Sequence, residues 1–275
     1  MEKKIAVIGG DLRTIYLTEM LAKENTVITY GQELSNIKSD AMKIDNLKNA
    51  IELSDIIIGP VPFSKDGESL LVEYGKEQIL IKDIINYSKK KILIAGSIKK
   101  EACKLADDND VQIIDLMKEE NLTILNTIAT AEGALEIAIK KTKRILHGSN
   151  VLVLGYGRVA RVVAQKFAAL SAKVTCAARK PEAFAWIEVD GHESLNINKL
   201  GKNLADFDIV INTPPTTILT KDRLAKLKNH CLLIDLASYP GGVDVKAAKE
   251  LGINFEWALG LPRKDSTYYS GRTHL

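Results

Sequence analysis

Two series of short apolar runs constrain the fold of this chain more than any other feature. Continuous runs of Ile, Val and Leu recur along the 275 residues and alternate with segments that suit helices. Strands that are buried on both faces of a parallel sheet have this unbroken apolar character. The sequence therefore predicts an α/β fold with two doubly wound, Rossmann-like parallel sheets.

The two series divide the chain into two predicted domains. The first series comprises KIAVIGG (Lys4–Gly10), TVITYG (Thr26–Gly31), DIIIGP (Asp55–Pro60), KILIAG (Lys91–Gly96) and VQIIDL (Val111–Leu116). The second comprises VLVL (Val151–Leu154), KVTCAA (Lys173–Ala178), FDIVINTPP (Phe207–Pro215), CLLIDLAS (Cys231–Ser238) and INFEWAL (Ile253–Leu259). We predict an N-terminal α/β domain at residues 1–122 and a second domain at residues 123–275.

One long helix is predicted to join the domains, over residues 127–146. In TIATAEGALEIAIKKTKRIL, apolar or small residues recur every three or four positions, which places them on one helix face. These residues are Ile128, Ala131, Leu135, Ala138, Thr142 and Ile145. A basic cluster, composed of Lys140, Lys141, Lys143 and Arg144, lies at the negative end of this helix, where we expect it to be solvated.

The charge balance argues against a polyanionic partner. The 38 Lys and Arg residues and the 35 Asp and Glu residues are interspersed along the chain and give a net charge of +3. No large field of one sign is expected, so we expect no nucleic acid partner.

The N-terminus and the cysteines indicate a cytoplasmic protein. The first apolar run is broken at once by Gly9–Asp11, and no other run comes close to a membrane span, so we expect neither a signal peptide nor a membrane segment. The widely spaced Cys103, Cys176 and Cys231 suit a reducing compartment and suggest no metal site. We expect Cys176 and Cys231 to be buried structural thiols.

The strongest local motif is GYGRVA at residues 155–160. It has the form G-x-G-x-x-A, directly after the strand VLVL and before the helical run RVARVVAQKFAAL, which is the context of a dinucleotide-binding turn. Gly155 would permit the tight turn, Gly157 the approach of a pyrophosphate, and Ala160 close helix packing. The predicted cofactor-binding residues here are Gly155, Tyr156, Gly157, Arg158 and Val159. The alternative is a Rossmann-like domain that has lost its ligand.

The end of the next predicted strand indicates which nucleotide is bound. A site for NAD usually has Asp or Glu here, which accepts hydrogen bonds from the ribose 2′-hydroxyl and would repel a 2′-phosphate. In this chain Ala177 and Ala178 are followed by Arg179 and Lys180, two cations that suit a 2′-phosphate. We therefore predict NADP as the cofactor; NAD stays possible if the two cations merely open a solvated loop.

Two further loops of the second domain are predicted to line the nicotinamide side of the site. They supply Thr213 and Pro214 from NTPP, and Asp235, Ala237 and Ser238 from DLASYPGG. Ligands of open α/β sheets bind at the carboxyl ends of the strands, where both loops lie. Ordinary turn chemistry is the alternative for both.

Together these motifs resemble the family of A subunits of dipicolinate synthase from spore-forming bacteria. The resemblance rests on IAVIGGDLR, GPVPFSKDG, NTIATAEGALEIAI, HGSNVLVLGYGRVA, DLASYPGGVD and ALGLP, and extends over nearly the whole chain. It implies an NADP-dependent oxidoreductase that acts on a CH–CH bond during sporulation together with a flavoprotein-like B subunit, in a homo- or hetero-oligomer. The implied substrate is a dihydrodipicolinate-level intermediate of the lysine pathway, 4-hydroxy-tetrahydrodipicolinate, which would lose water and a hydride.

A small dicarboxylate substrate of this kind needs cationic or polar partners. The candidates are Arg13 and Pro62 in the first domain, which would be the substrate domain, and Asn126, Thr130 and Glu132 at the start of the joining helix. An ordinary surface role for Arg13, and helix-start chemistry for Thr130 and Glu132, are the alternatives. No residue is predicted as the catalytic acid or base; His147 is the nearest histidine to the glycine-rich turn.

The chain departs from the family pattern at two places. After ALGLP the family continues with a glycine and an APxTAG-like stretch, whereas here Arg263–Leu275 follows, so either an element that closes over the substrate is lost or this terminus differs. Ser171 stands where the family has a glycine at a helix C-terminus, which we expect to cost stability rather than function.

Two other functions fit the same residues. A free-standing D-2-hydroxyacid-type dehydrogenase would need an arginine and an acid–base histidine from the later loops, and DLASYPGG supplies neither. A non-catalytic, nucleotide-binding regulatory subunit would bind the cofactor without turnover.

Overall fold

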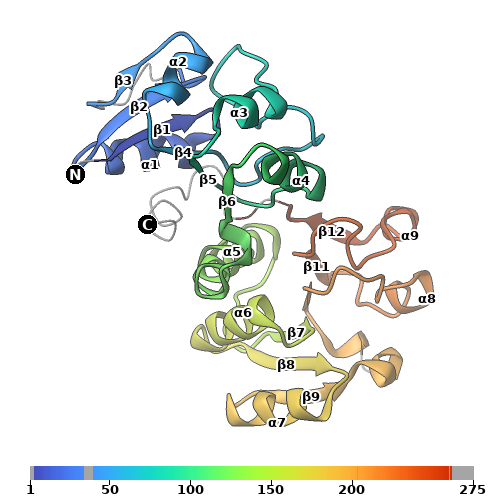
Figure 1. Ribbon diagram of the computed structural model, residues 1–275. Helices are drawn as coiled ribbons and strands as arrows, with labels where there is room; N and C mark the ends of the chain where they lie inside the picture. The colour runs from blue at the N-terminus through green and yellow to red at the C-terminus, as the bar shows by residue number, and fades with distance from the viewer. Residues whose placement is uncertain (1–2, 34–39, 203, 260, 262–275) are drawn as a thin grey trace. The chain divides into compact units, whose positions relative to one another are not determined.

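The chain folds into two α/β units. The computed structural model describes residues 3–33, 40–202, 204–259 and 261, and the units divide between Thr123 and Ile124. Each unit contains a six-stranded sheet whose neighbouring strands are parallel. Helices flank each sheet (Figure 1). The prediction of two doubly wound parallel sheets is confirmed.

The first unit has the strand order β3-β2-β1-β4-β5-β6. Its strands are β1 (Lys4–Ile8), β2 (Thr26–Tyr30), β3 (Met42–Lys43), β4 (Ile56–Ile58), β5 (Ile92–Ala95) and β6 (Gln112–Asp115). Its helices are α1 (Leu12–Leu21), α2 (Leu47–Glu52), α3 (Ile81–Tyr87) and α4 (Lys100–Asp108), followed by the 3-10 helix η1 (Leu116–Lys118). The strand order reverses between β1 and β4.

The second unit repeats the same order when it is followed from β9, as β9-β8-β7-β10-β11-β12. Its strands are β7 (Asn150–Leu154), β8 (Lys173–Ala178), β9 (Glu193–Asn196), β10 (Ile209–Asn212), β11 (Leu232–Asp235) and β12 (Asn254–Trp257). Its helices are α5 (Glu120–Lys141), which begins just before the unit, α6 (Arg158–Ala169), α7 (Pro181–Val189), α8 (Lys221–Leu224), α9 (Val245–Glu250) and the 3-10 helices η2 (Ile197–Lys202) and η3 (Leu204–Asp206). The order reverses between β7 and β10, which is where ligands of such sheets bind.

The apolar runs are unbroken because both faces of each sheet are covered. In β7, Val151 and Val153 pack in a core with α5 and α6, whereas Leu152 and Leu154 pack in a second core with α8 and α9. Successive side chains of a strand point to opposite faces, so a strand between two helical layers must be apolar at every position. The residues of β1 divide between two cores in the same way.

The joining helix differs from its prediction at both ends. We expected residues 127–146, but α5 runs over Glu120–Lys141. The centre of the predicted apolar stripe is right, because Ala131 and Ala138 are fully buried. Ile145 lies beyond the helix, and its side chain is 76% exposed.

The early end of α5 is explained by the turn that follows it. The Thr142 hydroxyl donates to the carbonyl of Arg144 at 2.8 Å, and the Ser149 hydroxyl donates to the carbonyl of Leu146 at 2.7 Å. Such side-chain bonds to the backbone compete with continued helix. Periodicity alone does not report this competition.

By length and composition alone, α5 is the one helix among the described residues that is long and apolar enough to cross a membrane. The expectation that no run comes close to such a span was therefore too strict. Its buried residues Ala131, Ala134 and Ala138 belong to the core of the second unit. On its exposed side Glu136 pairs with Lys140 at 2.5 Å. Packing within the unit accounts for these small residues, whereas Ile124, Leu125 and Ile139 of the same helix are exposed.

Two of the four edge strands, β3 and β9, were not predicted. Both residues of β3 are exposed, and β9 has the polar sequence ESLN with two exposed residues. Neither strand carries an apolar run, so the signal that found the other ten strands is missing here.

Burial of Cys176 and Cys231 is confirmed. The two thiols belong to the cores of the second unit, and burial raises the pKa of each to about 12. Because the thiolate is the reactive form, both side chains are chemically inert at neutral pH. All three cysteines are free.

Replacing Ser171 by glycine is predicted to stabilise the protein. Ser171 follows the C-cap of α6 and has φ +61°, in the left-handed region that favours glycine. We expect Ser171→Gly to raise the free energy of unfolding by about 1 kcal/mol in urea titrations. The control is Ala225→Gly at the C-cap of α8, where φ is −63° and glycine should bring no gain. Equal gains in both variants would contradict the assignment of strain to Ser171.

Candidate nucleotide site

The turn after β7 leaves room for a ligand against its backbone. Gly155 has φ +90°, and a Cβ there would lie 2.8 Å from the Thr213 hydroxyl oxygen, so only glycine fits. At Gly157 a Cβ would meet no atom within 4 Å. Gly157 is also the N-cap of α6 and makes no side-chain cap hydrogen bond. An anion can therefore approach the positive end of α6.

The corresponding turn of the first unit is filled by the chain itself. Asp11 is the N-cap of α1, and its Oδ1 accepts a hydrogen bond from the N–H of Arg13 at 2.9 Å. The same carboxylate forms an ion pair of 2.6 Å with the Arg13 guanidinium. A Cβ at Gly10 would lie 2.1 Å from the Thr14 hydroxyl oxygen. A phosphate at this helix end would meet the Asp11 carboxylate, which disfavours a second nucleotide site.

The two cations that follow β8 line the same cavity as the glycine turn. Ala177 and Ala178 are buried, whereas Arg179 and Lys180 are exposed. The cavity has a volume of about 410 Å³, within the range of small-ligand pockets. Within the part of the chain that the structure describes, neither basic side chain forms an ion pair, so both charges are available to a ligand.

The lining of this cavity also contains an arginine that the sequence did not single out. Arg223, on α8, is half-buried and donates to the carbonyl of Ile218 at 2.8 Å and to that of Ile197 at 3.4 Å. It therefore ties η2 to the loop after β10 and adds positive charge to the cavity. A lone arginine in a short polar helix has no pattern that would have found it.

The Tyr156 side chain is engaged in the fold. Its hydroxyl donates to Asp190 Oδ2 at 2.5 Å, and Arg161 donates to the same oxygen at 3.1 Å. The Arg161 guanidinium lies 4.9 Å from the ring centre of Trp186 and 5.6 Å from that of Tyr156. Burial raises the pKa of Tyr156, and the hydrogen bond from Tyr156 lowers the pKa of Asp190. Tyr156 thus keeps its proton and anchors the turn to the end of α7.

Asp235 shapes the loop after β11 from inside. Its carboxylate is 1% exposed and accepts hydrogen bonds from Asn212 Nδ2 at 2.7 Å, Ala237 N at 3.0 Å and Gly242 N at 2.8 Å. A Cβ at Gly242 would lie 2.0 Å from Asn212, so glycine is required there. Among the predicted loop residues, Ser238 is exposed, whereas Asp235 positions the loop and has no free oxygen to offer.

Thr213 and Pro214 lie where the strand order reverses. The Thr213 hydroxyl donates to the carbonyl of Leu154 at 2.9 Å, which joins the ends of β7 and β10. Pro214 lines the cavity of Arg179 and Lys180, here called the nucleotide cavity, beside Gly155. Of the predicted residues, this cavity brings together Gly155, Tyr156, Arg179, Lys180 and Pro214.

The predicted substrate residues of the first unit lie together but are already partnered. Arg13 Nη2 donates to the carbonyl of Val61, the residue before Pro62, at 2.5 Å, in addition to its pair with Asp11. The cavity beside Arg13 has a volume of only about 20 Å³. An incoming carboxylate would have to share or replace Asp11 on this guanidinium.

The predicted substrate residues of the second unit lie on α5. The Thr130 hydroxyl donates to the carbonyl of Asn126 at 3.3 Å, and Glu132 pairs with Lys166 of α6 at 2.9 Å. Because α5 begins at Glu120, Thr130 and Glu132 lie well inside the helix, and the alternative of helix-start chemistry for them is wrong.

The segment Arg263–Leu275, where the chain departs from the family pattern, lies outside the described residues. Among the residues that are described, no group of three or more His, Cys, Asp or Glu side chains is placed to hold a metal ion. His147 is exposed in the turn after α5, on the amino-terminal side of β7. The glycine turn is at the other end of β7, so His147 is no candidate base for chemistry at that turn.

Comparisons with known proteins match both units. Residues 4–117 match the family model of the N-terminal domain of the dipicolinate synthase A subunit. Residues 126–242 match the model described as "D-isomer specific 2-hydroxyacid dehydrogenase, NAD binding domain". The fold and the site thus define a two-unit protein of the dehydrogenase class, whose second unit is of the type that binds a nicotinamide cofactor.

Relatives of known identity match over nearly the full chain. The dipicolinate synthase A subunit of Bacillus subtilis is 32% identical over 263 residues, 94% of this chain and 89% of the relative. The crystal structure of that synthase's A chain, also from Bacillus subtilis, has a TM-score of 0.89 at 30% identity, and covers 100% of this chain and 93% of that one. The A subunit from Bacillus halodurans has a TM-score of 0.90 at 30% identity, with 99% and 94% covered. The chain belongs to the family of dipicolinate synthase A subunits, which confirms the resemblance seen in its motifs.

Replacing Asp235 by asparagine is predicted to destabilise the second unit. The new side-chain amide would supply one acceptor oxygen where three donors converge, so at least one buried N–H would lose its partner. We expect Asp235→Asn to lower the free energy of unfolding by about 2 kcal/mol in urea titrations. Asp222→Asn, at an exposed position of α8, is the control and should change it by less than about 0.5 kcal/mol. Similar losses in both variants would count against this role of Asp235.

Proposed function

We propose that the second unit binds NADP and that the chain is the oxidoreductase subunit of a dipicolinate synthase. The observation that supports the cofactor preference is the placement of Arg179 and Lys180. Both are exposed in the cavity of the glycine turn, and the strand before them ends in Ala178 instead of a carboxylate. Cations at this position favour a 2′-phosphate, which a carboxylate would repel.

The residues of the second unit would bind and orient the cofactor, which when bound supplies the acceptor for a hydride. Gly157 and the first turn of α6, with Arg158 and Val159, would face the pyrophosphate. Arg179 and Lys180 would hold the 2′-phosphate, and Arg223, bound to the carbonyl of Ile218, would add a third cation to the cavity. The loops that Asp235 and Thr213 position, with Ala237 and Ser238, would line the nicotinamide side.

We further propose 4-hydroxy-tetrahydrodipicolinate as the substrate, converted to dipicolinate during sporulation. Two carboxylates require partners, and Arg13, Pro62, Asn126, Thr130 and Glu132 are the candidates. Arg13 would bind one carboxylate by sharing or exchanging Asp11. Family membership supports a partnership with a flavoprotein-like B subunit, and three free cysteines suit the cytoplasm.

Removing the Arg179 guanidinium is predicted to weaken NADP binding selectively. A charge-assisted hydrogen bond contributes roughly 1.5–3 kcal/mol, so Arg179→Ala should lower NADP affinity by about ten- to a hundredfold. NAD has no 2′-phosphate, so its affinity should scarcely change. Calorimetric titration with both nucleotides measures the difference. Equal losses for NAD and NADP would contradict the assignment.

Two control variants separate specificity from general binding. Gly157→Val would place side-chain atoms in the open space beside the turn and should weaken the binding of both NAD and NADP. Lys246→Ala removes an exposed charge of α9 outside the nucleotide cavity and should change the affinity for neither nucleotide.

The reaction is tested with the complete chain and its B subunit. The two proteins, 4-hydroxy-tetrahydrodipicolinate and NADP should give the ultraviolet absorbance of dipicolinate. Failure to form product with either nucleotide would overturn the proposed reaction. Cofactor binding without turnover beside an active partner would favour the regulatory alternative, and turnover of 2-hydroxy acids by the chain alone would favour the dehydrogenase alternative.

A further inference from the structure

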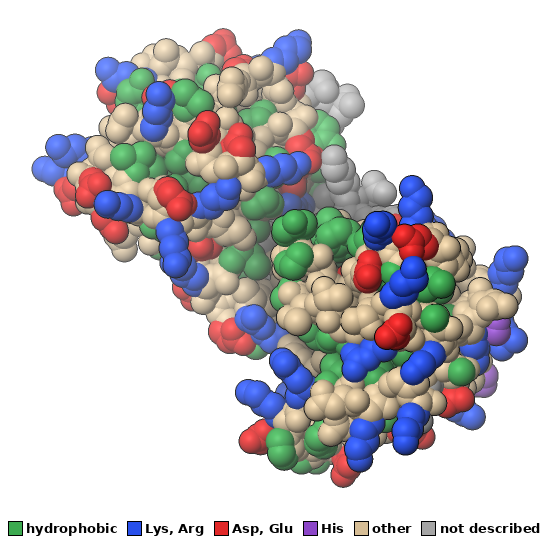
Figure 2. All heavy atoms as spheres, turned by 90° about the vertical axis from the view of Figure 1, so that its right-hand side faces the viewer, with side chains coloured by type: hydrophobic (Ala, Val, Ile, Leu, Met, Phe, Trp, Pro, Cys, Tyr) green, Lys and Arg blue, Asp and Glu red, His purple; other side chains and the backbone are tan. Residues whose placement is uncertain are grey.

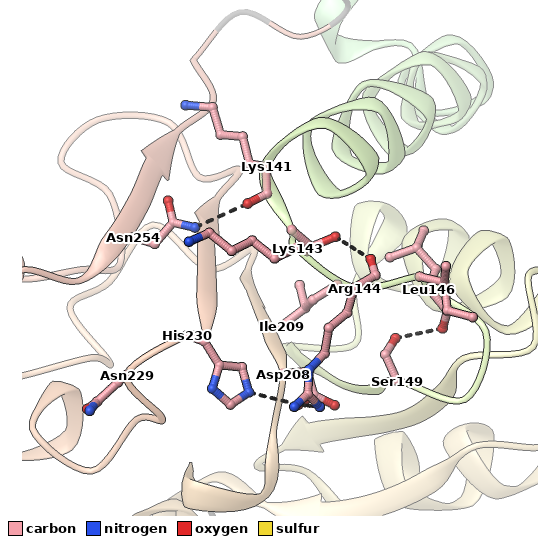
Figure 3. Close-up of a pocket in the computed structure, with 12 residues that line it drawn as sticks. Lys141, Lys143, Arg144, Leu146, Ser149, Asp208, Ile209, Asn229, His230 and Asn254 are labelled. Atoms are coloured by element: carbon pink, nitrogen blue, oxygen red, sulfur yellow. Dashed lines mark hydrogen bonds and ion pairs between the residues drawn. The ribbon is translucent and has the colours of Figure 1, made fainter.

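A second cavity of the second unit (Figure 3) lies at the amino-terminal ends of its strands, whereas the nucleotide cavity lies at their carboxyl ends. Its lining residues precede or begin strands: Ser149 before β7, Asp208 before β10, His230 before β11 and Asn254 at the start of β12. Its volume is about 650 Å³, larger than the nucleotide cavity. Nothing in the proposed function uses this end of the sheet.

The lining of this cavity is basic. Three members of the basic cluster and His230 line it, against one acid, Asp208, among the lining residues described. Elsewhere, basic and acidic side chains are interspersed over the visible face of the molecule (Figure 2). Lys141 is neutralised by Glu256 at 2.6 Å, but the other two members, Lys143 and Arg144, lack so close an acidic partner in the described structure.

The one carboxylate of the lining is already occupied. Asp208 Oδ2 accepts from the N–H of Asn150 at 2.9 Å, and Oδ1 pairs with Lys228 at 2.9 Å. His230 and Arg144 approach the same Oδ1 only to 3.5 Å and 3.7 Å. One carboxylate is therefore shared by Lys228 and Arg144, and Lys143 adds a further cation, so the cavity keeps an excess of positive charge that a further anion would relieve.

The cavity also has an apolar part. Ile145, Leu146 and Ile209 line it, and Ile145 is 76% exposed. A cavity of about 650 Å³ is much larger than an inorganic anion needs and falls within the range that holds metabolite-sized ligands. The apolar side chains thus favour an organic anion over sulfate or phosphate.

The cations occupy two separate places in the cavity. Figure 3 shows Lys143 extending toward Asn254, whereas Arg144 and His230 lie beside Asp208. A ligand that neutralises both places needs two anionic groups with a body between them. The basic cluster, which the sequence predicted to be merely solvated, is the source of both cations, Lys143 and Arg144.

We propose that this cavity binds a small organic dicarboxylate, at a site separate from the nucleotide cavity. One carboxylate would pair with Lys143, the other with Arg144 beside His230, and the body between them would contact Ile145. The inference does not depend on the nucleotide preference or on the reaction, because it uses only residues at the amino-terminal ends of the strands.

The test is amide hydrogen exchange of the full chain with isophthalate, a planar dicarboxylate. Isophthalate at millimolar concentration should protect amides of residues 142–149 and 229–230. Benzoate, with one carboxylate, and sulfate, with no apolar body, should protect them much less. No protection of these residues by isophthalate would overturn the proposal, as would equal protection by sulfate.

Reversing the charges of Lys143 and Arg144 tests whether isophthalate binds in this cavity. The double variant Lys143→Glu and Arg144→Glu should lower isophthalate affinity at least about tenfold, because it replaces two attractions by two repulsions. The matched control, Lys246→Glu and Lys249→Glu on α9, makes the same change of net charge outside the cavity and should bind as the unaltered chain does. Equal affinity in the two double variants would contradict the assignment.

A parallel titration with NADP separates this inference from the proposed function. The Lys143→Glu and Arg144→Glu variant should bind NADP as the unaltered chain does, which also shows that it is folded. Loss of isophthalate protection with normal NADP binding supports the second site. Loss of NADP binding in the Arg179→Ala variant bears only on the nucleotide site.

Discussion

The positive end of the helix that follows the first strand of each sheet decides what the two units can bind. The exposed N–H groups of such a helix end require an anion or another acceptor. At α1 the chain supplies it, through the Asp11 carboxylate and its ion pair with Arg13. At α6 the N-cap is Gly157, with open space before it. Two sheets of identical strand order therefore present different helix ends, one capped by the chain's own carboxylate and one open to an anion.

The remaining site residues depend on this turn being held in place. Tyr156 is anchored by Asp190, Gly155 fits against Thr213, and the buried Asp235 carboxylate fixes the loop that follows β11. These contacts preorganise the loops at the carboxyl ends of the strands in the second sheet. A ligand therefore meets a formed surface and does not have to order these loops. At the amino-terminal ends of the same strands, Arg144 of the short Thr142–Ser149 turn lies near Asp208, which also pairs with Lys228.

Much of the fold followed from the sequence because burial on both faces leaves a strong signal. The apolar runs located ten strands, whereas the exposed β3 and the polar β9 left none. The glycine turn and the cations Arg179 and Lys180 were found because their chemistry is local in sequence. Arg223 was missed because only the fold brings α8 to the cavity, and the pairing of Arg13 with Asp11 and Val61 depends on a rotamer that no spacing reveals.

The 2′-phosphate of bound NADP is the most direct probe of the nucleotide site. Its second ionisation has a pKa near 6 in water, and contact with Arg179 and Lys180 should lower that pKa, because two cations favour the dianion. Phosphorus-31 NMR of NADP with the full chain, recorded as a function of pH, measures this pKa on the bound nucleotide. A 2′-phosphate that titrates below that of free NADP is the predicted result. A bound nucleotide whose 2′-phosphate titrates as in free solution would contradict the placement of these cations and with it the preference for NADP.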